Sequence, residues 1–130
     1  MSFLPDMPAA ARRHLEAADS LPEKRYDVAG YLYGIAAECA IKAMMMDCGL
    51  RPQGDRRDDP FYAHFPELKT RLRDASLGRK GQALRRFIEN DAFLNHWEID
   101  MRYCKGSEIE RRWVDAWRDQ ARNAVSSIGT

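Results

Sequence analysis

The chain has 130 residues, of which 45% are hydrophobic and 32% are charged, and its formal net charge is +1. This length suits one folded domain with a real core, so we expect a single domain over residues 1–130. The near-neutral charge excludes a strong overall attraction to nucleic acid. No run approaches the roughly 20 apolar residues that cross a membrane, and residues 1–11 lack the pattern of a secretion signal. We therefore expect a cytoplasmic protein without membrane association.

The cysteines and histidines show no metal-binding spacing. The three cysteines form no C-x-x-C pair, and the three histidines form no H-x-x-x-H or H-E-x-x-H pair. A zinc site or a disulfide framework therefore has no support from spacing. We expect no metal and no cofactor.

The first half of the chain predicts two helices. Apolar residues recur at helical spacing, without the period-two alternation of strands. The first helix is expected over about 8–20, with Asp6 before it in reach of an N-cap role. A long second helix is expected over about 26–48, with Gly49 as the residue that follows its end.

The second half predicts a loop and three shorter helices. Residues 50–63 contain two prolines, a glycine and six charges, which is typical of a loop. A third helix should begin near Phe65, with Pro66 at its first position. A fourth should follow Gly81 and continue the apolar pattern, after a kink, through Phe93, Leu94 and Trp97.

The final helix is predicted to begin at a capping box formed by Ser107 and Glu110. Its two tryptophans are interpreted as core anchors within one buried face, formed by Ile109, Trp113, Ala116, Trp117, Ala124 and Ile128. The whole chain therefore predicts an all-α, up-and-down bundle of about five helices.

The second helix is apolar nearly all round and should be the most buried element. Gly30, Gly34, Glu38 and Lys42 recur every four residues and lie along one slowly drifting stripe. A charge on a central helix is costly unless it has a partner, so Glu38 and Lys42 are candidate functional residues. The structural alternative is a stabilising i,i+4 pair, with glycines that permit close packing.

Two further surfaces are suggested by composition. Met44, Met45 and Met46 offer adaptable apolar surface for self-association. Residues 67–86 carry seven basic and two acidic side chains. Such a segment suits phosphate contacts, with Arg71 and Lys80 as candidate binding residues, or it is simply a solvated surface.

Three elements resemble the HEPN family, the higher eukaryotes and prokaryotes nucleotide-binding domains. Residues 31–43, Tyr-Leu-Tyr-Gly-Ile-Ala-Ala-Glu-Cys-Ala-Ile-Lys-Ala, look like its second helix. His64-Phe-Pro-Glu-Leu68 looks like its histidine–x–x–x–leucine element, and residues 97–103 resemble the tryptophan-to-Arg-Tyr segment of some bacterial members. The resemblance spans about residues 12–125.

The resemblance implies a bundle of four to five helices that commonly forms a dimer. Many bacterial members are toxins, or accessory partners of small nucleotidyltransferases, and several are metal-independent ribonucleases. Their catalytic mark is an arginine followed four to six residues later by a histidine on a late helix. Here only Arg57 and His64 fit, with six residues between them, in a loop, and we interpret this pair as coincidence.

A different set of polar residues could converge instead. Glu38, His64 and Arg102 are the candidate catalytic residues, because a carboxylate, an imidazole and a guanidinium suffice for metal-free attack of a ribose 2′-hydroxyl on phosphate. Lys42, Asp100 and Tyr103 are candidate binding residues around them. The structural alternative is a buried Glu38–Arg102 ion pair with Tyr103 packed beside it.

Three functions therefore stay open. The first is a dimeric partner module, in a toxin–antitoxin type system with a small nucleotidyltransferase. The second is a metal-independent ribonuclease with a non-standard site, and the third is a nucleotide-binding regulator that uses the basic helices. The missing arginine–histidine mark favours the first.

Overall fold

The computed structural model describes residues 5–52, 58–75 and 77–130 and is helical, with no strand in these ranges. The longer helices are α1 (Met7–Ser20), α2 (Tyr26–Asp47) and α5 (Arg111–Ser126). Two short α-helices, α3 (Glu67–Arg73) and α4 (Gln82–Ile88), lie between α2 and α5. The remaining helical turns are of the 3-10 type: η1 (Glu23–Arg25), η2 (Pro60–Tyr62), η3 (Arg79–Gly81), η4 (Ile99–Tyr103) and η5 (Gly106–Glu108).

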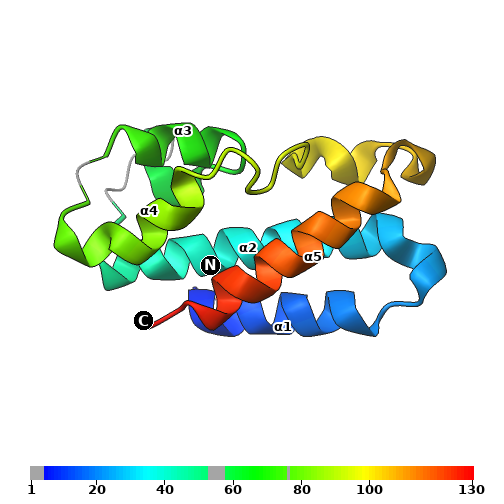
Figure 1. Cartoon of the computed structure of the whole chain (residues 1–130), viewed down its shortest axis with the longest axis horizontal. Coiled ribbons are helices and arrows are strands. Elements are labelled where there is room, and N and C mark those ends of the chain that lie inside the picture. Colours follow the sequence, from blue (N-terminus) through cyan, green and yellow to red (C-terminus); the bar gives the residue numbers. More distant parts are fainter. Residues whose placement is uncertain (1–4, 53–57, 76) are drawn as a thin grey trace.

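The helices form an up-and-down bundle whose third leg, between α2 and α5, is a series of short helices and turns instead of one long helix (Figure 1). The chain runs along α1, returns along α2, and goes back through α3, α4 and η4 before α5 returns beside α2. The start of α5 lies against the start of α2, because a Cβ on Gly30 would meet the side chains of Val114 and Trp117. The predicted all-α bundle is therefore confirmed, and the third leg consists of short helices and turns.

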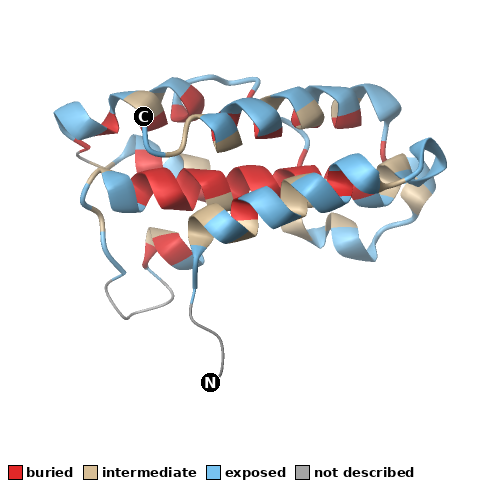
Figure 2. Cartoon of the chain, turned by 90° about the horizontal axis from the view of Figure 1, so that it is seen from below, coloured by how far each residue is buried: buried red, intermediate tan, exposed pale blue. Residues whose placement is uncertain are grey.

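Helix α2 is the central element, as its nearly continuous apolar surface predicts. Buried positions follow one another along most of its length (Figure 2). Trp97 packs against Gly34, and a Cβ there would overlap its indole ring. The two glycines of the helix therefore permit close packing.

The ends of the first two helices agree with prediction. The Asp6 carboxylate accepts a hydrogen bond from Ala9 N at 3.0 Å and caps α1. Gly49 follows α2 with φ of +99°, a left-handed conformation that suits glycine. In the described part of the chain, no helix is both long enough and apolar enough to cross a membrane.

The later boundaries differ from prediction. Helix α4 ends at Ile88. Phe93 and Leu94 lie in turns and Trp97 in irregular backbone, not in a continued helix. Helix α5 begins at Arg111 without a side-chain cap, so the predicted capping box at Ser107 and Glu110 is wrong. The buried face of α5 is also shifted: Trp117 is a core anchor, whereas Ala116 is exposed and Trp113 and Ile128 are half-buried.

Candidate functional site

The polar centre of the molecule is the carboxylate of Glu38, in the middle of α2. Helical spacing turns this side chain toward the segment that precedes α3, and the residue is only 4% exposed. Its Oε2 lies 2.9 Å from His64 Nδ1 and 3.4 Å from Lys42 Nζ. Its Oε1 accepts a hydrogen bond from Phe65 N at 3.2 Å. Of the polar residues predicted to converge, the structure therefore brings Glu38, Lys42 and His64 together.

These contacts give Glu38 the compensation that a buried charge needs. Lys42 is 6% exposed and shares the same carboxylate oxygen with His64. A buried carboxylate with a cation and two hydrogen-bond donors avoids most of the cost of desolvation. The cluster therefore fastens the segment before α3 to the central helix.

His64 is the member of the cluster that reaches solvent. Its side chain is 47% exposed, whereas that of Glu38 is 6% exposed. When Nδ1–H donates to Glu38, Nε2 becomes the acceptor and remains for other contacts. This carboxylate–imidazole arrangement fits a general base or acid, and it fits equally well a structural tie.

The cavity beside His64 is acidic. Its volume is about 500 Å³, and the predicted binding residue Asp100 lines it together with Glu67 and Glu98. The Glu67 carboxylate pairs with Arg71 Nη2 at 3.1 Å. Carboxylates around the imidazole repel a phosphate group, which disfavours RNA at this place.

Arg102 does not pair with Glu38. Its guanidinium lies 4.9 Å from the centre of the Tyr103 ring, and Tyr103 is 76% exposed. A hydrogen bond with Tyr31 raises the pKa of Arg102 above its usual value. The predicted alternative of a buried Glu38–Arg102 ion pair is therefore wrong, because His64, Lys42 and the backbone satisfy Glu38 instead.

The remaining predicted binding residues lie apart from one another. Arg71 is paired within α3, as described above, whereas Lys80 lies at a separate cleft beside α4. The interpretation of the Arg57–His64 spacing as coincidence concerns a residue outside the described ranges, since Arg57 is not described. Within those ranges, no group of three or more histidine, cysteine, aspartate and glutamate side chains is placed to hold a metal ion.

The loop that carries His96 was not predicted from the sequence. Leu94 and His96 have positive φ values of 53° and 71°, and the His96 ring stacks on Trp113 at 4.5 Å. Gln120 Oε1 accepts from Leu94 N at 2.8 Å, and Trp117 Nε1 donates to the Asn95 carbonyl at 2.9 Å. Side chains of α5 thus hold the backbone of the His96 loop in this conformation. The only sign of this loop in the sequence was the position of Gln120 and Trp117 on the last predicted helix.

Lys69 supports the same loop from α3. Its ammonium group donates to the carbonyls of Asn90 and Phe93. Burial, followed by the nearby charge of Arg73, lowers the pKa of Lys69 from its usual value. Lys69 is therefore a structural residue and not part of a free basic surface.

In comparisons with known proteins, no protein-family model, no curated protein and no solved structure matches the chain.

Proposed function

We propose that this protein is a HEPN-like helical module that acts as a homodimer and as an accessory partner of another protein. The observation that carries the proposal is an uncharged stripe on the outer side of α2. The sequence resemblance to HEPN domains supports the same assembly.

The α2 stripe comprises five residues at helical spacing, Val28, Leu32, Ile35, Cys39 and Met46. Val28 and Met46 are each 38% exposed, and the other three are half-buried. Every member is apolar or weakly polar, although solvent-facing helix positions are ordinarily charged or polar. The central helix thus keeps an apolar surface that α1 and α5 do not cover.

The stripe replaces the methionine surface predicted from the sequence. Met44 and Met45 are 4% and 0% exposed and belong to the core, so that part of the prediction is wrong. Met46 alone of the three contributes to the stripe. The reason is the helical turn: consecutive residues point 100° apart, so three in a row cannot share one face.

A second copy of the chain is the occupant that best fits the stripe. An uncharged surface is complementary to itself, and two-fold symmetric dimers use the same patch on both partners. Two α2 helices packed across a two-fold axis would bury both stripes. The His64 cluster lies on the same helix through Glu38, so the dimer would also place two such clusters near one interface.

The test compares two matched variants by light scattering after size-exclusion chromatography. Ile35→Glu puts a charge in the centre of the stripe and should yield a monomer that keeps its helical circular dichroism spectrum. Asn123→Glu adds the same side chain at an exposed position of α5 and should remain dimeric. Equal masses for the two variants would remove the stripe from the proposal.

The partner role extends the proposal to a small nucleotidyltransferase. Its basis is the family resemblance, in which small helical domains of this kind accompany such enzymes. If a neighbouring gene encodes one, the two proteins should co-purify at a fixed ratio after co-expression. Their separation on the first column would reject this partner.

A metal-independent ribonuclease is the second candidate. The Glu38–His64 contact favours it, whereas the carboxylates beside His64 count against RNA there, so it ranks below the partner module. His64 would take the proton of a ribose 2′-hydroxyl, whose oxygen attacks the adjacent phosphorus. The bond from phosphorus to the 5′-oxygen of the next nucleotide breaks, that oxygen takes a proton from the imidazolium or from water, and the cleaved RNA ends in a 2′,3′-cyclic phosphate. Cleavage in the presence of a chelator should then fall by roughly 10²–10⁴ in His64→Ala. His96→Ala is the matched control. An RNA assay with no cleavage by the unmodified protein excludes this candidate.

A further inference from the structure

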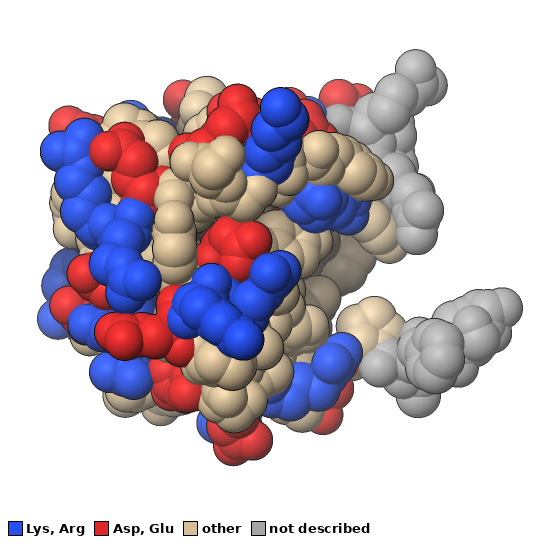
Figure 3. Space-filling model, turned by 90° about the vertical axis from the view of Figure 1, so that its right-hand side faces the viewer, with Lys and Arg blue, Asp and Glu red and all other residues tan. Residues whose placement is uncertain are grey.

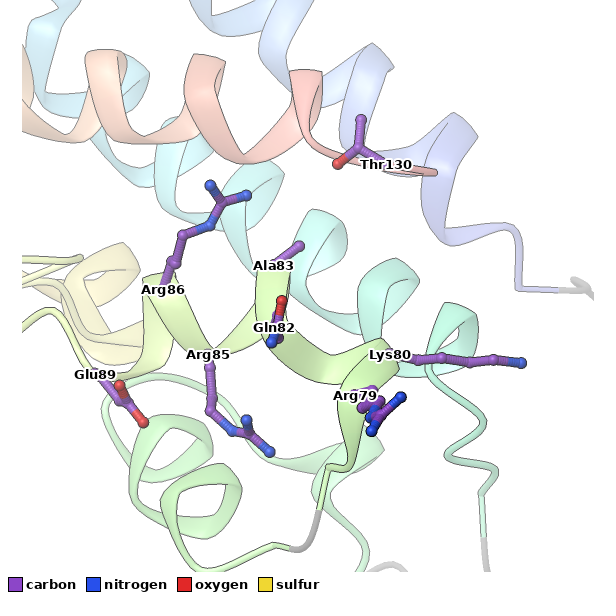
Figure 4. A pocket seen from close by; sticks show the side chains of 8 residues that line it. All are labelled: Arg79, Lys80, Gln82, Ala83, Arg85, Arg86, Glu89 and Thr130. Carbon is purple, nitrogen blue, oxygen red and sulfur yellow. The ribbon is translucent and has the colours of Figure 1, made fainter.

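A cleft beside α4 gathers the positive charges of the second half of the chain. Its volume is about 590 Å³, and it lies among η3, α4 and the C-terminal residue (Figure 4). Four of its lining residues are basic and one is acidic. These are Arg79, Lys80, Arg85, Arg86 and Glu89.

The four cations differ from those of the preceding helix. In α3, Arg71 pairs with Glu67 at 3.1 Å and Arg73 pairs with Asp91 at 2.7 Å. Among the residues that the structure describes, the ion pairs include none for the four cleft cations. The basic segment of residues 67–86 therefore has two parts. The arginines of α3 form ion pairs, whereas the four cleft cations form none within the described residues.

The opposite end of the molecule shows what a merely solvated charged surface looks like here. Where α1 turns into α2 and α5 begins, basic and acidic side chains are interspersed (Figure 3). Ion pairs such as Arg111–Glu23 and Arg112–Glu110 form at that end. Compensation of this kind is what the α4 cleft lacks.

The cleft cations sit on a fixed scaffold. Leu84, Phe87 and Ile88 anchor α4 in the core, and Gly81 packs closely against Leu77. Arg85 Nη2 donates to the Gly78 carbonyl at 3.2 Å, and this bond holds the Arg85 guanidinium beside the residue that precedes η3. Like charges that line one cleft repel one another, and a multivalent anion relieves that repulsion.

The shape and lining of the cleft restrict the ligand. Among the described residues, no aromatic side chain lines it, so these residues offer no platform on which a nucleobase could stack. Arginine guanidinium groups bind phosphate oxygens in a bidentate manner. We infer that the α4 cleft is a binding site for a compact ligand with two or more linked phosphate groups, recognised through the phosphates alone.

The inference is tested by calorimetric titration with tripolyphosphate at low salt. Saturable binding to one site per chain is expected, at least about tenfold tighter than for orthophosphate because several cations act together. Binding should weaken as sodium chloride rises from about 50 to 300 mM, since the cleft is open to solvent. Absence of saturable binding at low salt would overturn the inference.

Paired variants locate the site. Lys80→Gln/Arg86→Gln should weaken binding of tripolyphosphate by at least about tenfold, through loss of charge-assisted hydrogen bonds. Arg111→Gln/Arg112→Gln removes the same charge at the opposite end and should bind as the unmodified protein does. Circular dichroism melts establish that both variants fold. Equal loss in both would show attraction to overall charge only and would contradict the assignment.

Two additional ligands identify the source of the phosphates. A nucleoside triphosphate should bind about as tightly as tripolyphosphate, and a short RNA should bind no more tightly at equal phosphate concentration. A strong preference for either would show base or strand recognition and would overturn the inference. The Ile35→Glu variant should bind tripolyphosphate as the unmodified protein does, because Ile35 does not line the cleft. The outcome of the phosphate-binding test is therefore independent of whether the protein forms a dimer.

Discussion

Glu38 is the residue on which the polar interior depends. Its carboxylate joins α2 to the segment before α3 through His64 and Phe65 N, and it also neutralises Lys42. Because these groups are linked through one carboxylate, its removal affects all of them at once. The arrangement explains how two charges are tolerated on the central helix.

The substitution Glu38→Gln should lower the free energy of unfolding by about 3–5 kcal/mol, because it leaves Lys42 buried without its counter-charge. Urea denaturation followed by circular dichroism measures this loss. Glu67→Gln is the control, since the exposed Glu67–Arg71 pair should contribute less than about 1 kcal/mol. Similar losses in the two variants would contradict the role assigned to Glu38.

The phenol of Tyr33 should make the folding stability depend on pH in the alkaline range. Burial, followed by its hydrogen bond to Asp19 at 2.6 Å, raises the pKa of Tyr33 to about 12. In the unfolded chain the pKa is about 10. Between these values the folded protein holds a proton that the unfolded chain has lost, so stability falls as pH rises.

Unfolding experiments between pH 9 and 12 should therefore show a steeper loss of stability in the unmodified protein than in Tyr33→Phe. Burial also raises the pKa of Cys39 to about 11, so a decline between pH 9 and 11 should persist in both proteins. Parallel curves for the two proteins up to pH 12 would exclude the Tyr33 contribution.

Sequence reasoning predicted part of the polar site around Glu38 and misplaced Arg102. Four-residue spacing brought Glu38 and Lys42 together, since both lie on one regular helix. The position of Arg102 depends on the irregular path between Ile88 and Arg111, which spacing does not encode. Its interaction with Tyr31 and Tyr103 therefore became visible only in three dimensions.

Among the elements, α2 was predictable because its apolar surface extends over most of its circumference. The turns after α4 were not, because Phe93, Leu94 and Trp97 are spaced as on a helix. Hydrogen bonds with the Gln120 and Trp117 side chains, from Leu94 N to Gln120 Oε1 and from Trp117 Nε1 to the Asn95 carbonyl, hold this segment in a different conformation. Tertiary contacts thus override the local pattern there.

Gly34 tests how closely α2 must be packed. In an isolated helix Gly→Ala would gain about 1 kcal/mol of helix propensity. Here a Cβ would overlap the Trp97 indole, so Gly34→Ala should destabilise the protein by at least about 1–3 kcal/mol. Thermal and urea unfolding decide the sign. A stabilised variant would show that the indole can move aside.

At the scale of the whole molecule, charge and apolar surface are separated. Interspersed charges occupy the end at which α5 begins, uncompensated cations occupy the α4 cleft, and the α2 stripe is uncharged. We propose a different role for the α2 stripe and for the α4 cleft. Self-association through the stripe is the claim on which the proposed function depends.

Sedimentation equilibrium of the unmodified protein over micromolar concentrations tests that claim most directly. The chain mass is 15.0 kDa, and the account predicts a species of twice that mass. Because two chains combine in the proposed dimer, the dimer fraction should rise with concentration by mass action. A single 15.0 kDa species up to high micromolar concentration would contradict the account.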